Sequence, residues 1–202
     1  MGKSSKGSAF EREICKKLSL WWTHKERDDI FWRTAGSGAR ATVRGRKGKS
    51  TAGHYGDIMA VDSIGADLIK VLTFELKCGY TRFTFMDLLD KLDHAALQEY
   101  EKWIMQAMES QRQAGSLFWA VIHRRTRRKT LLYAPISLFK SLNSVCCNLY
   151  PVLQMTCWIN GEKILVGGIT LDEFLDKVTP EGIRDMPLPE SAGKQRVFKP
   201  VN

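Results

Sequence analysis

One apolar run, Leu68–Cys78 (LIKVLTFELKC), constrains the fold of this chain more than any other segment. Its length and apolar character predict a buried β-strand. Side chains alternate between the two faces of a strand, so Glu75 and Lys77 are expected side by side on one face. Burying a carboxylate and an ammonium costs free energy. A function such as binding a cation would explain why charged residues stand in this strand. Spacing alone leaves two interpretations open, a functional pair or an ion pair on a partly exposed face.

A second carboxylate, Asp57, begins the strand predicted at Asp57–Val61. If that strand pairs with Leu68–Cys78 as a hairpin, Asp57 comes close to Glu75. Two carboxylates, a backbone carbonyl and waters form the hard-oxygen site that Mg²⁺ or Mn²⁺ prefers. Lys77 beside such a cation can orient a water molecule and help to deprotonate it. These residues predict a hydrolytic site that uses Mg²⁺, with Mn²⁺ as a substitute.

The N-terminal segment predicts an amphipathic helix from Ala9 to about Trp22. On a helical wheel of about 100° per residue, Glu11 lies about 30° from the buried direction, whereas Glu13 lies about 130° away. Glu13 is therefore expected at the surface, and Glu11 is expected to need a partner. The two candidate partners of Glu11 are the predicted metal site and Arg33, which follows in the strand expected at Ile30–Thr34.

The order of the remaining elements predicts the fold class. Helix, strands, long helix and two further strands indicate an α/β sandwich with a central mixed β-sheet flanked by helices. We expect a single domain at 1–179, with a core at about 6–134, an elaboration at 135–179 and a loosely attached tail at 180–202. The other expected elements are a turn at Asp62–Asp67, a helix from Phe83 or Asp87 to about Gln111, strands at Ser116–His123 and Thr130–Ala134, a helix at Ile136–Leu142, a hairpin at Met155–Val166 and a helix at Leu171–Val178.

Positive charge is concentrated in two segments of this 202-residue chain, whose formal net charge is +9. The Gly-, Ser- and Arg-rich segment 36–54 and the segment 123–129 (HRRTRRK) predict exposed cationic loops. Such loops favour nucleic acid, because they release counterions condensed on a polyanion, although solvated surface turns are the alternative. The side chains expected to contact DNA are Arg33, Ser37, Arg40, Arg44, Arg46, Lys47, Lys49, Arg124, Arg125, Arg127 and Arg128.

Composition excludes several classes of protein. A hydrophobic share of 44% with six tryptophans excludes a disordered chain. No run approaches the roughly 18 apolar residues of a membrane span, so we expect a soluble cytoplasmic protein, in the host cytoplasm if it is viral. The five cysteines form no C-x-x-C pair, which favours free, mostly buried thiols over disulfides or a zinc site. The four histidines (His24, His54, His94 and His123) suggest neither a metal site nor a triad and are expected at surface or helix positions.

Four motifs, taken together and in this order, resemble the PD-(D/E)XK nuclease superfamily. They are Lys6-Gly7-x-x-x-Glu11-Arg12-Glu13, Arg33-Thr34-Ala35-Gly36-Ser37-Gly38, Gly56-Asp57-Ile58-Met59-Ala60 and Phe74-Glu75-Leu76-Lys77. Their order is most similar to that of the Holliday-junction resolvases of the archaeal Hjc and bacterial RecU type, over about residues 6–134.

The resemblance implies a restriction-endonuclease-like fold and a catalytic site made of Glu11, Asp57, Glu75 and Lys77. Asp57 and Glu75 would be metal ligands, Glu11 would complete the metal shell and Lys77 would assist the attacking water. Arg33 would contact backbone phosphate. The resemblance also implies a homodimer that acts on two strands of branched DNA.

Two departures from the family pattern leave the choice of substrate open. The loop Ser37–Gly56 is longer and more basic than in the compact resolvases, and Gly56 replaces the proline often found before the first aspartate. A restriction-like or nicking endonuclease on duplex DNA is one alternative. A DNA-binding protein on an inactive nuclease scaffold is another.

Overall fold

The computed structural model describes residues 6–34, 55–92, 95–145, 148–159 and 161–187. The helices are α1 (Lys6–Trp22), the 3-10 helix η1 (Ser63–Gly65), α3 (Ala66–Val71), α4 (Met86–Leu89), α5 (Glu99–Ala114), α6 (Ile136–Val145), α7 (Leu171–Lys177) and α8 (Pro180–Arg184). The strands are β1 (Phe31–Arg33), β2 (Ile58–Ala60), β3 (Leu72–Cys78), β4 (Phe118–Arg124), β5 (Thr130–Pro135), β6 (Leu153–Ile159) and β7 (Glu162–Thr170). None of the helices in these ranges has the length and apolar character to cross a membrane.

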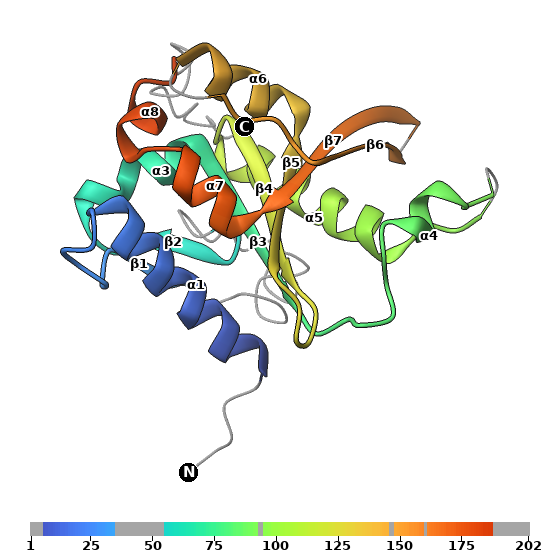
Figure 1. The fold of residues 1–202 in the computed structure, drawn as a ribbon, viewed down its shortest axis with the longest axis horizontal. Helices are drawn as coiled ribbons and strands as arrows, with labels where there is room; N and C mark the ends of the chain where they lie inside the picture. The colour runs from blue at the N-terminus through green and yellow to red at the C-terminus, as the bar shows by residue number, and fades with distance from the viewer. Residues whose placement is uncertain (1–5, 35–54, 93–94, 146–147, 160, 188–202) are drawn as a thin grey trace, which may run out of the picture.

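A five-stranded mixed sheet forms the centre of the molecule, in the order β3-β4-β5-β7-β6 (Figure 1). Strands β3 and β4 are parallel, and the other neighbours are antiparallel. A parallel pair needs a crossover connection, which α5 supplies between β3 and β4. Strands β1 and β2 form a separate antiparallel pair. The predicted α/β sandwich with helices around a mixed sheet is confirmed, and it is consistent with a restriction-endonuclease-like fold.

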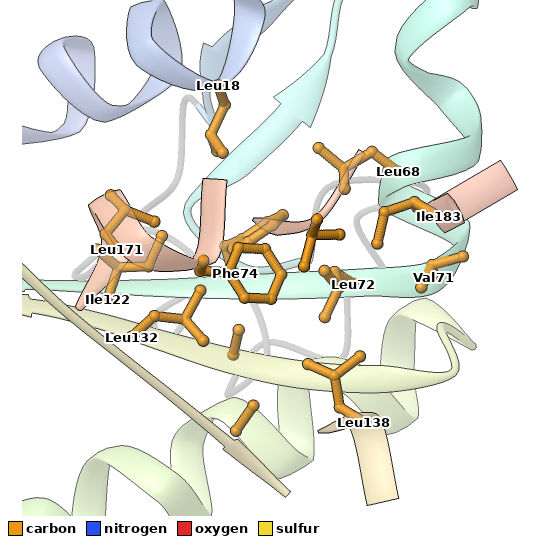
Figure 2. Packing of buried hydrophobic residues seen from close by; sticks show 14 of the residues in the cluster. Leu18, Leu68, Val71, Leu72, Phe74, Ile122, Leu132, Leu138, Leu171 and Ile183 are labelled. Carbon is orange, nitrogen blue, oxygen red and sulfur yellow. The ribbon is translucent and has the colours of Figure 1, made fainter. Parts of the chain in front are cut away.

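The apolar face of β3 lies in the larger hydrophobic cluster of the core. Leu72, Phe74 and Leu76 alternate along this face and are buried. Figure 2 shows Phe74 among the labelled side chains, with Leu18 of α1 on one side of the ring and Leu132 of β5 on the other. Helices α1, α3, α6, α7 and α8 all contribute buried residues to this cluster.

The opposite face of the sheet packs against α5. Trp103 and Ile104 of α5 lie in a second cluster with Trp119 and Val121 of β4. By alternation, Thr73, Glu75 and Lys77 belong to this face of β3. The strand therefore separates an apolar layer from a layer that carries charged side chains.

The apolar run Leu68–Cys78 is a strand only from Leu72 onwards. Its first part belongs to α3, in which Leu68 and Val71 are buried at helical spacing and Lys70 pairs with Asp67 one turn earlier. The turn expected at Asp62–Asp67 is η1 followed by the start of α3. The strand prediction failed for residues 68–71 because a short, continuous apolar run is compatible with both a buried helix and a buried strand.

The expected hairpin between the strand at Asp57–Val61 and β3 is wrong. Strand β2 pairs with β1 instead, with Phe31 opposite Ala60. Helices η1 and α3 fill the connection from β2 to β3, so no tight turn joins the two strands.

The single long helix expected up to Gln111 is also wrong, since α4 and α5 are separate. A capping box starts α5, because the Glu101 carboxylate accepts a hydrogen bond from the backbone N–H of Gln98. The same carboxylate accepts hydrogen bonds from Lys91, at 2.8 and 3.0 Å. These contacts fix the start of α5 on the connection from α4.

The expected loose tail from residue 180 begins with a packed helix, which corrects that boundary. Thr179 caps α8, Pro180 occupies its first turn, and Ile183 and Met186 are buried. The guanidinium of Arg184 lies 4.4 Å from the centroid of the Trp22 ring of α1. Residues 188–202 lie outside the described residues. The predicted hairpins β4–β5 and β6–β7 and the helices α6 and α7 are confirmed.

Replacing Ile183 by alanine should therefore destabilise the whole domain. Ile183 is fully buried, so we expect the free energy of unfolding to fall by about 2–5 kcal/mol, measured by urea denaturation. Ile64→Ala, at a side chain that is 45% exposed, is the control and should change it by no more than about 0.5 kcal/mol. Equal effects of the two substitutions would contradict the assignment of α8 to the core.

Candidate functional site

Asp57 is fixed against the middle of β3 by its own backbone and side chain. Its N–H donates to the carbonyl of Phe74 at 2.8 Å, and its Oδ2 accepts from the N–H of Leu76 at 2.7 Å. Its carbonyl accepts from the N–H of Thr34 at 3.0 Å. The expected proximity of Asp57 to the Glu75 strand is therefore confirmed, although it comes from these bonds and not from a hairpin.

Gly56 has a steric reason to be glycine. Its φ is +76°, a conformation that other residues adopt rarely and that the proline ring forbids. A Cβ atom at this position would lie 2.7 Å from the carbonyl oxygen of Phe74. The glycine that replaces the usual proline thus permits the close approach of this segment to β3.

Glu75 and Lys77 form a hydrogen-bonded group with Gln106 of α5. Glu75 is 2% exposed, and its Oε1 accepts from Lys77 Nζ at 2.8 Å and from Gln106 Nε2 at 2.6 Å. Gln106 Oε1 accepts from Lys77 Nζ at 2.9 Å. Lys77 and Glu75 lie on one face of β3, as predicted.

Gln106 is a site residue that the sequence reasoning missed. It follows the buried Trp103 by three positions and precedes the buried Ala107, so it lies at the border of the apolar stripe of α5. A polar residue at such a border points towards the edge of the face that the helix covers. This signal was present in the sequence, but many surface glutamines share it.

Asp57 and Glu75 place two carboxyl groups close together in a buried site. Burial raises the pKa of Asp57 well above its ordinary value, and the nearby charge of Glu75 raises it further. The hydrogen bond from Leu76 and the charge of Lys77 act in the opposite direction. A bound cation would favour the ionised form of both carboxyl groups.

The residues present fit a divalent cation. Among the hydrogen bonds of the described residues, Oδ2 of Asp57 accepts from Leu76 and Oε1 of Glu75 accepts from Lys77 and Gln106, and none reaches Oδ1 of Asp57 or Oε2 of Glu75. Within the described ranges, no three His, Cys, Asp or Glu side chains form a ready-made metal cluster. Mg²⁺ commonly binds through one or two carboxylates and retains several waters. Asp57 and Glu75 are suited to that mode.

Glu11 pairs with Arg33, one of its two predicted partners. Arg33 Nη1 donates to Glu11 Oε2 at 3.2 Å, and the Glu11 side chain is 16% exposed. Burial raises the pKa of the Cys15 thiol to about 12, and the charges of Glu11 and Asp57 contribute to that rise. Glu11 and Asp57 therefore lie near the same part of α1. The role of Glu11 as a metal ligand stays a prediction.

Among the predicted DNA-binding residues, Arg124 has partners within the protein. It donates to the Glu13 carboxylate, at 2.8 Å from Nη2, and its guanidinium lies 4.6 Å from the centroid of the Phe10 ring. These contacts hold α1 to the end of β4. The surface position predicted for Glu13 is confirmed, since its side chain is 53% exposed.

The tip of the β4–β5 hairpin carries exposed cations. Arg127 and Arg128 are exposed there, and Arg125 is half-buried. Because β4 runs parallel to β3, with Cys78 opposite Arg124, this tip projects from the end of the sheet at which Lys77 lies. The remaining predicted DNA contacts lie outside the described residues: Ser37, Arg40, Arg44, Arg46, Lys47 and Lys49.

His123 does not have the surface or helix position predicted for it. It is 1% exposed on β4, opposite Lys77 in the ladder, and its Nδ1 lies 3.3 Å from the hydroxyl of Tyr100. Burial lowers its pKa to about 4, so the imidazole is neutral at pH 7. His24 is exposed as expected, and His54 and His94 lie outside the described residues. Cys15, Cys78 and Cys157 are free thiols, as predicted.

A comparison with protein families gives one match over most of the chain. Residues 2–185 match the model of the family described as phage putative PDDEXK endonuclease. No curated protein and no solved structure gives a significant match.

Asp57→Asn should stabilise the metal-free protein near neutral pH. The raised pKa means that native Asp57 holds its proton above the unfolded value of about 3.9, so stability falls as pH rises through that window. Asparagine removes the charge and keeps an acceptor for the N–H of Leu76. In EDTA at pH 7, we expect the thermal midpoint to rise by about 3 °C or more.

The gain should shrink as the pH falls towards about 4 and disappear below about 3, where the aspartate is protonated in both states. Asp90→Asn, at an exposed position, is the control and should leave the midpoint nearly unchanged. A lower thermal midpoint for Asp57→Asn at pH 7 would show that burial and the charge of Glu75 do not destabilise the ionised Asp57 carboxylate.

Proposed function

The chain belongs to this phage PDDEXK endonuclease family, and we propose that it is a Mg²⁺-dependent DNA endonuclease whose site is formed by Asp57, Glu75 and Lys77. The observation that carries the proposal is the docking of Asp57 on β3, beside the pair of Glu75 and Lys77. Mn²⁺ is expected to substitute for Mg²⁺, because both prefer oxygen ligands. The proposed location of this activity is the cytoplasm, which is the host cytoplasm for a phage protein.

The residues have separate roles in the proposed hydrolysis. Asp57 and Glu75 would hold the cation through the oxygens that receive no hydrogen bond from the described residues. When bound, a divalent cation supplies Lewis acidity at the scissile phosphate and makes water more acidic. Lys77 would orient the attacking water and stabilise negative charge that develops on the phosphate. Glu11 would complete the metal shell.

DNA would be held through its phosphates. The hairpin tip offers Arg127 and Arg128 at the end of the sheet that carries Lys77. Arg33 is 38% exposed beside Glu11 and can reach a phosphate while it keeps that pair. Such contacts position the backbone without reading base sequence.

Branched DNA is the substrate that we propose within this class. The support is the order of Glu11, Asp57, Glu75 and Lys77, which resembles that of the Holliday-junction resolvases. Resolving a four-way junction requires two symmetric cuts, so a homodimer with a two-fold axis belongs to this proposal.

Cleavage of a synthetic four-way junction and of matched linear duplex tests the activity. With Mg²⁺, the wild type should nick the junction in pairs, and EDTA should abolish the reaction. Asp57→Asn and Lys77→Met should each lower the rate by about 100-fold or more. DNA binding should survive in both variants, since neither side chain belongs to the cationic tip.

Lys91→Met is a matched control for Lys77→Met. The Lys91–Glu101 pair has the same 2.8 Å separation and the same side-chain exposures, 14% and 3%, as Lys77–Glu75. Loss of a buried ion pair is thus common to the two variants, and only Lys77→Met should lose cleavage. Cutting of duplex as well as junction would favour a restriction-like enzyme. Binding without cleavage under any metal would indicate an inactive nuclease scaffold.

The hairpin tip should determine part of the salt dependence of DNA binding. Each lost phosphate contact reduces the slope of log K against log salt by about 0.9, so Arg127→Ala with Arg128→Ala should reduce it by about 2. Fluorescence anisotropy with a labelled junction at several salt concentrations measures this slope. The control is Lys140→Ala with Lys163→Ala, at exposed positions of α6 and β7. An unchanged slope in the arginine variant would remove the tip from the interface.

A further inference from the structure

Gln106 connects the two polar groups of β3 that carry the proposed chemistry. Its carboxamide donates to Glu75 Oε1 at 2.6 Å and accepts from Lys77 Nζ at 2.9 Å. Lys77 Nζ donates to the same Glu75 oxygen at 2.8 Å. The three side chains therefore form a closed ring of hydrogen bonds, and Gln106 comes from α5, the helix of the crossover between β3 and β4.

A carboxamide is the side-chain group that such a position requires. It presents a donor and an acceptor on the same planar end, so it can bind an acid and a cation together. A carboxylate at this position would bind Lys77 but would add a third negative charge beside Glu75 and Asp57. An apolar side chain would offer neither bond.

The ring matters most when Glu75 shares its charge with a cation. Lys77 is held in this structure by Glu75 and by Gln106. A cation on Glu75 would weaken the attraction between the carboxylate and the lysine, because the negative charge is then partly neutralised. The bond from Lys77 to the neutral Gln106 oxygen does not depend on that charge. It would keep the flexible lysine side chain in the site.

We propose that Gln106 is a positioning residue, which holds Lys77 in the cation-loaded site and fixes the rotamer of Glu75 for metal binding. This role rests on the proposed nuclease function. It assigns to α5 a part in the chemistry in addition to its packing against the sheet. Outer contacts of this kind commonly change metal affinity or activity by about 10- to 100-fold.

The test compares Gln106→Met with Gln113→Met. Methionine has a similar length to glutamine and forms neither of the two bonds. Gln113 is an exposed glutamine on the same helix that contacts only Glu109 in the described hydrogen bonds, and it is the matched control. Gln106 is exposed as well, so its replacement removes no core packing and the variant should fold.

Two readouts separate positioning from a merely structural effect. Calorimetric titration of the DNA-free protein with Mn²⁺ should show about tenfold weaker binding for Gln106→Met and no change for Gln113→Met. At saturating Mn²⁺, kcat for junction cleavage should fall about 10- to 100-fold while KM stays within about twofold.

Wild-type values of both quantities for Gln106→Met would overturn the proposal, as would equal losses in the two variants. A kcat that recovers fully at saturating Mn²⁺ would overturn the part that concerns Lys77. If the wild type binds Mn²⁺ but cleaves no DNA, the proposed function fails on its own. The Mn²⁺ affinities then still decide whether Gln106 orients Glu75.

Discussion

The docking of Asp57 onto β3 is the interaction on which the rest of the site depends. Two hydrogen bonds, from Asp57 N–H to the Phe74 carbonyl and from Leu76 N–H to Asp57 Oδ2, attach the β1–β2 pair to the edge of the main sheet. They bring the Asp57 carboxylate towards Glu75, although β2 and β3 do not pair as strands of one sheet. The positive φ of Gly56 makes this approach sterically possible. The core joins the two parts of the fold, but these two hydrogen bonds set the position of the Asp57 carboxylate against β3.

Strand β3 combines stability and chemistry because its two faces differ. Phe74 and its neighbours on one face lie in the main hydrophobic cluster, which keeps the strand rigid. On the other face, Glu75 is buried and Lys77 is partly buried, and both are held by Gln106 of α5. Functional groups on a regular element are placed more reproducibly than groups on loops.

Local patterns predicted most elements, but contacts distant in sequence could not be predicted. The alternation of side chains along a strand predicted that Glu75 and Lys77 share one face, and the helical wheel predicted that Glu11 points towards the protein interior. The pairing of β2 with β1, and not with β3, depends on which partner strand binds β2 more favourably. The sequence of one segment does not carry that information. The break before α5 depends on a cap at Gln98 that Lys91 reinforces through Glu101. Gln106 and the Glu13–Arg124 pair depend on contacts across the fold.

The parallel pairing of β3 with β4 has a consequence for the order of folding. The proposed site draws on Glu11, Asp57, Glu75 and Gln106, and Glu75 lies on a strand whose neighbour in the sheet begins only at Phe118. Contacts of such large sequence separation form late, after the entropy of closing long loops has been lost. A nascent chain in which β4 has not yet been synthesised therefore lacks the strand that pairs with β3 and helps to position Glu75. The proposed hydrolytic site is therefore expected to form together with the cooperative core, and not in a partly synthesised chain.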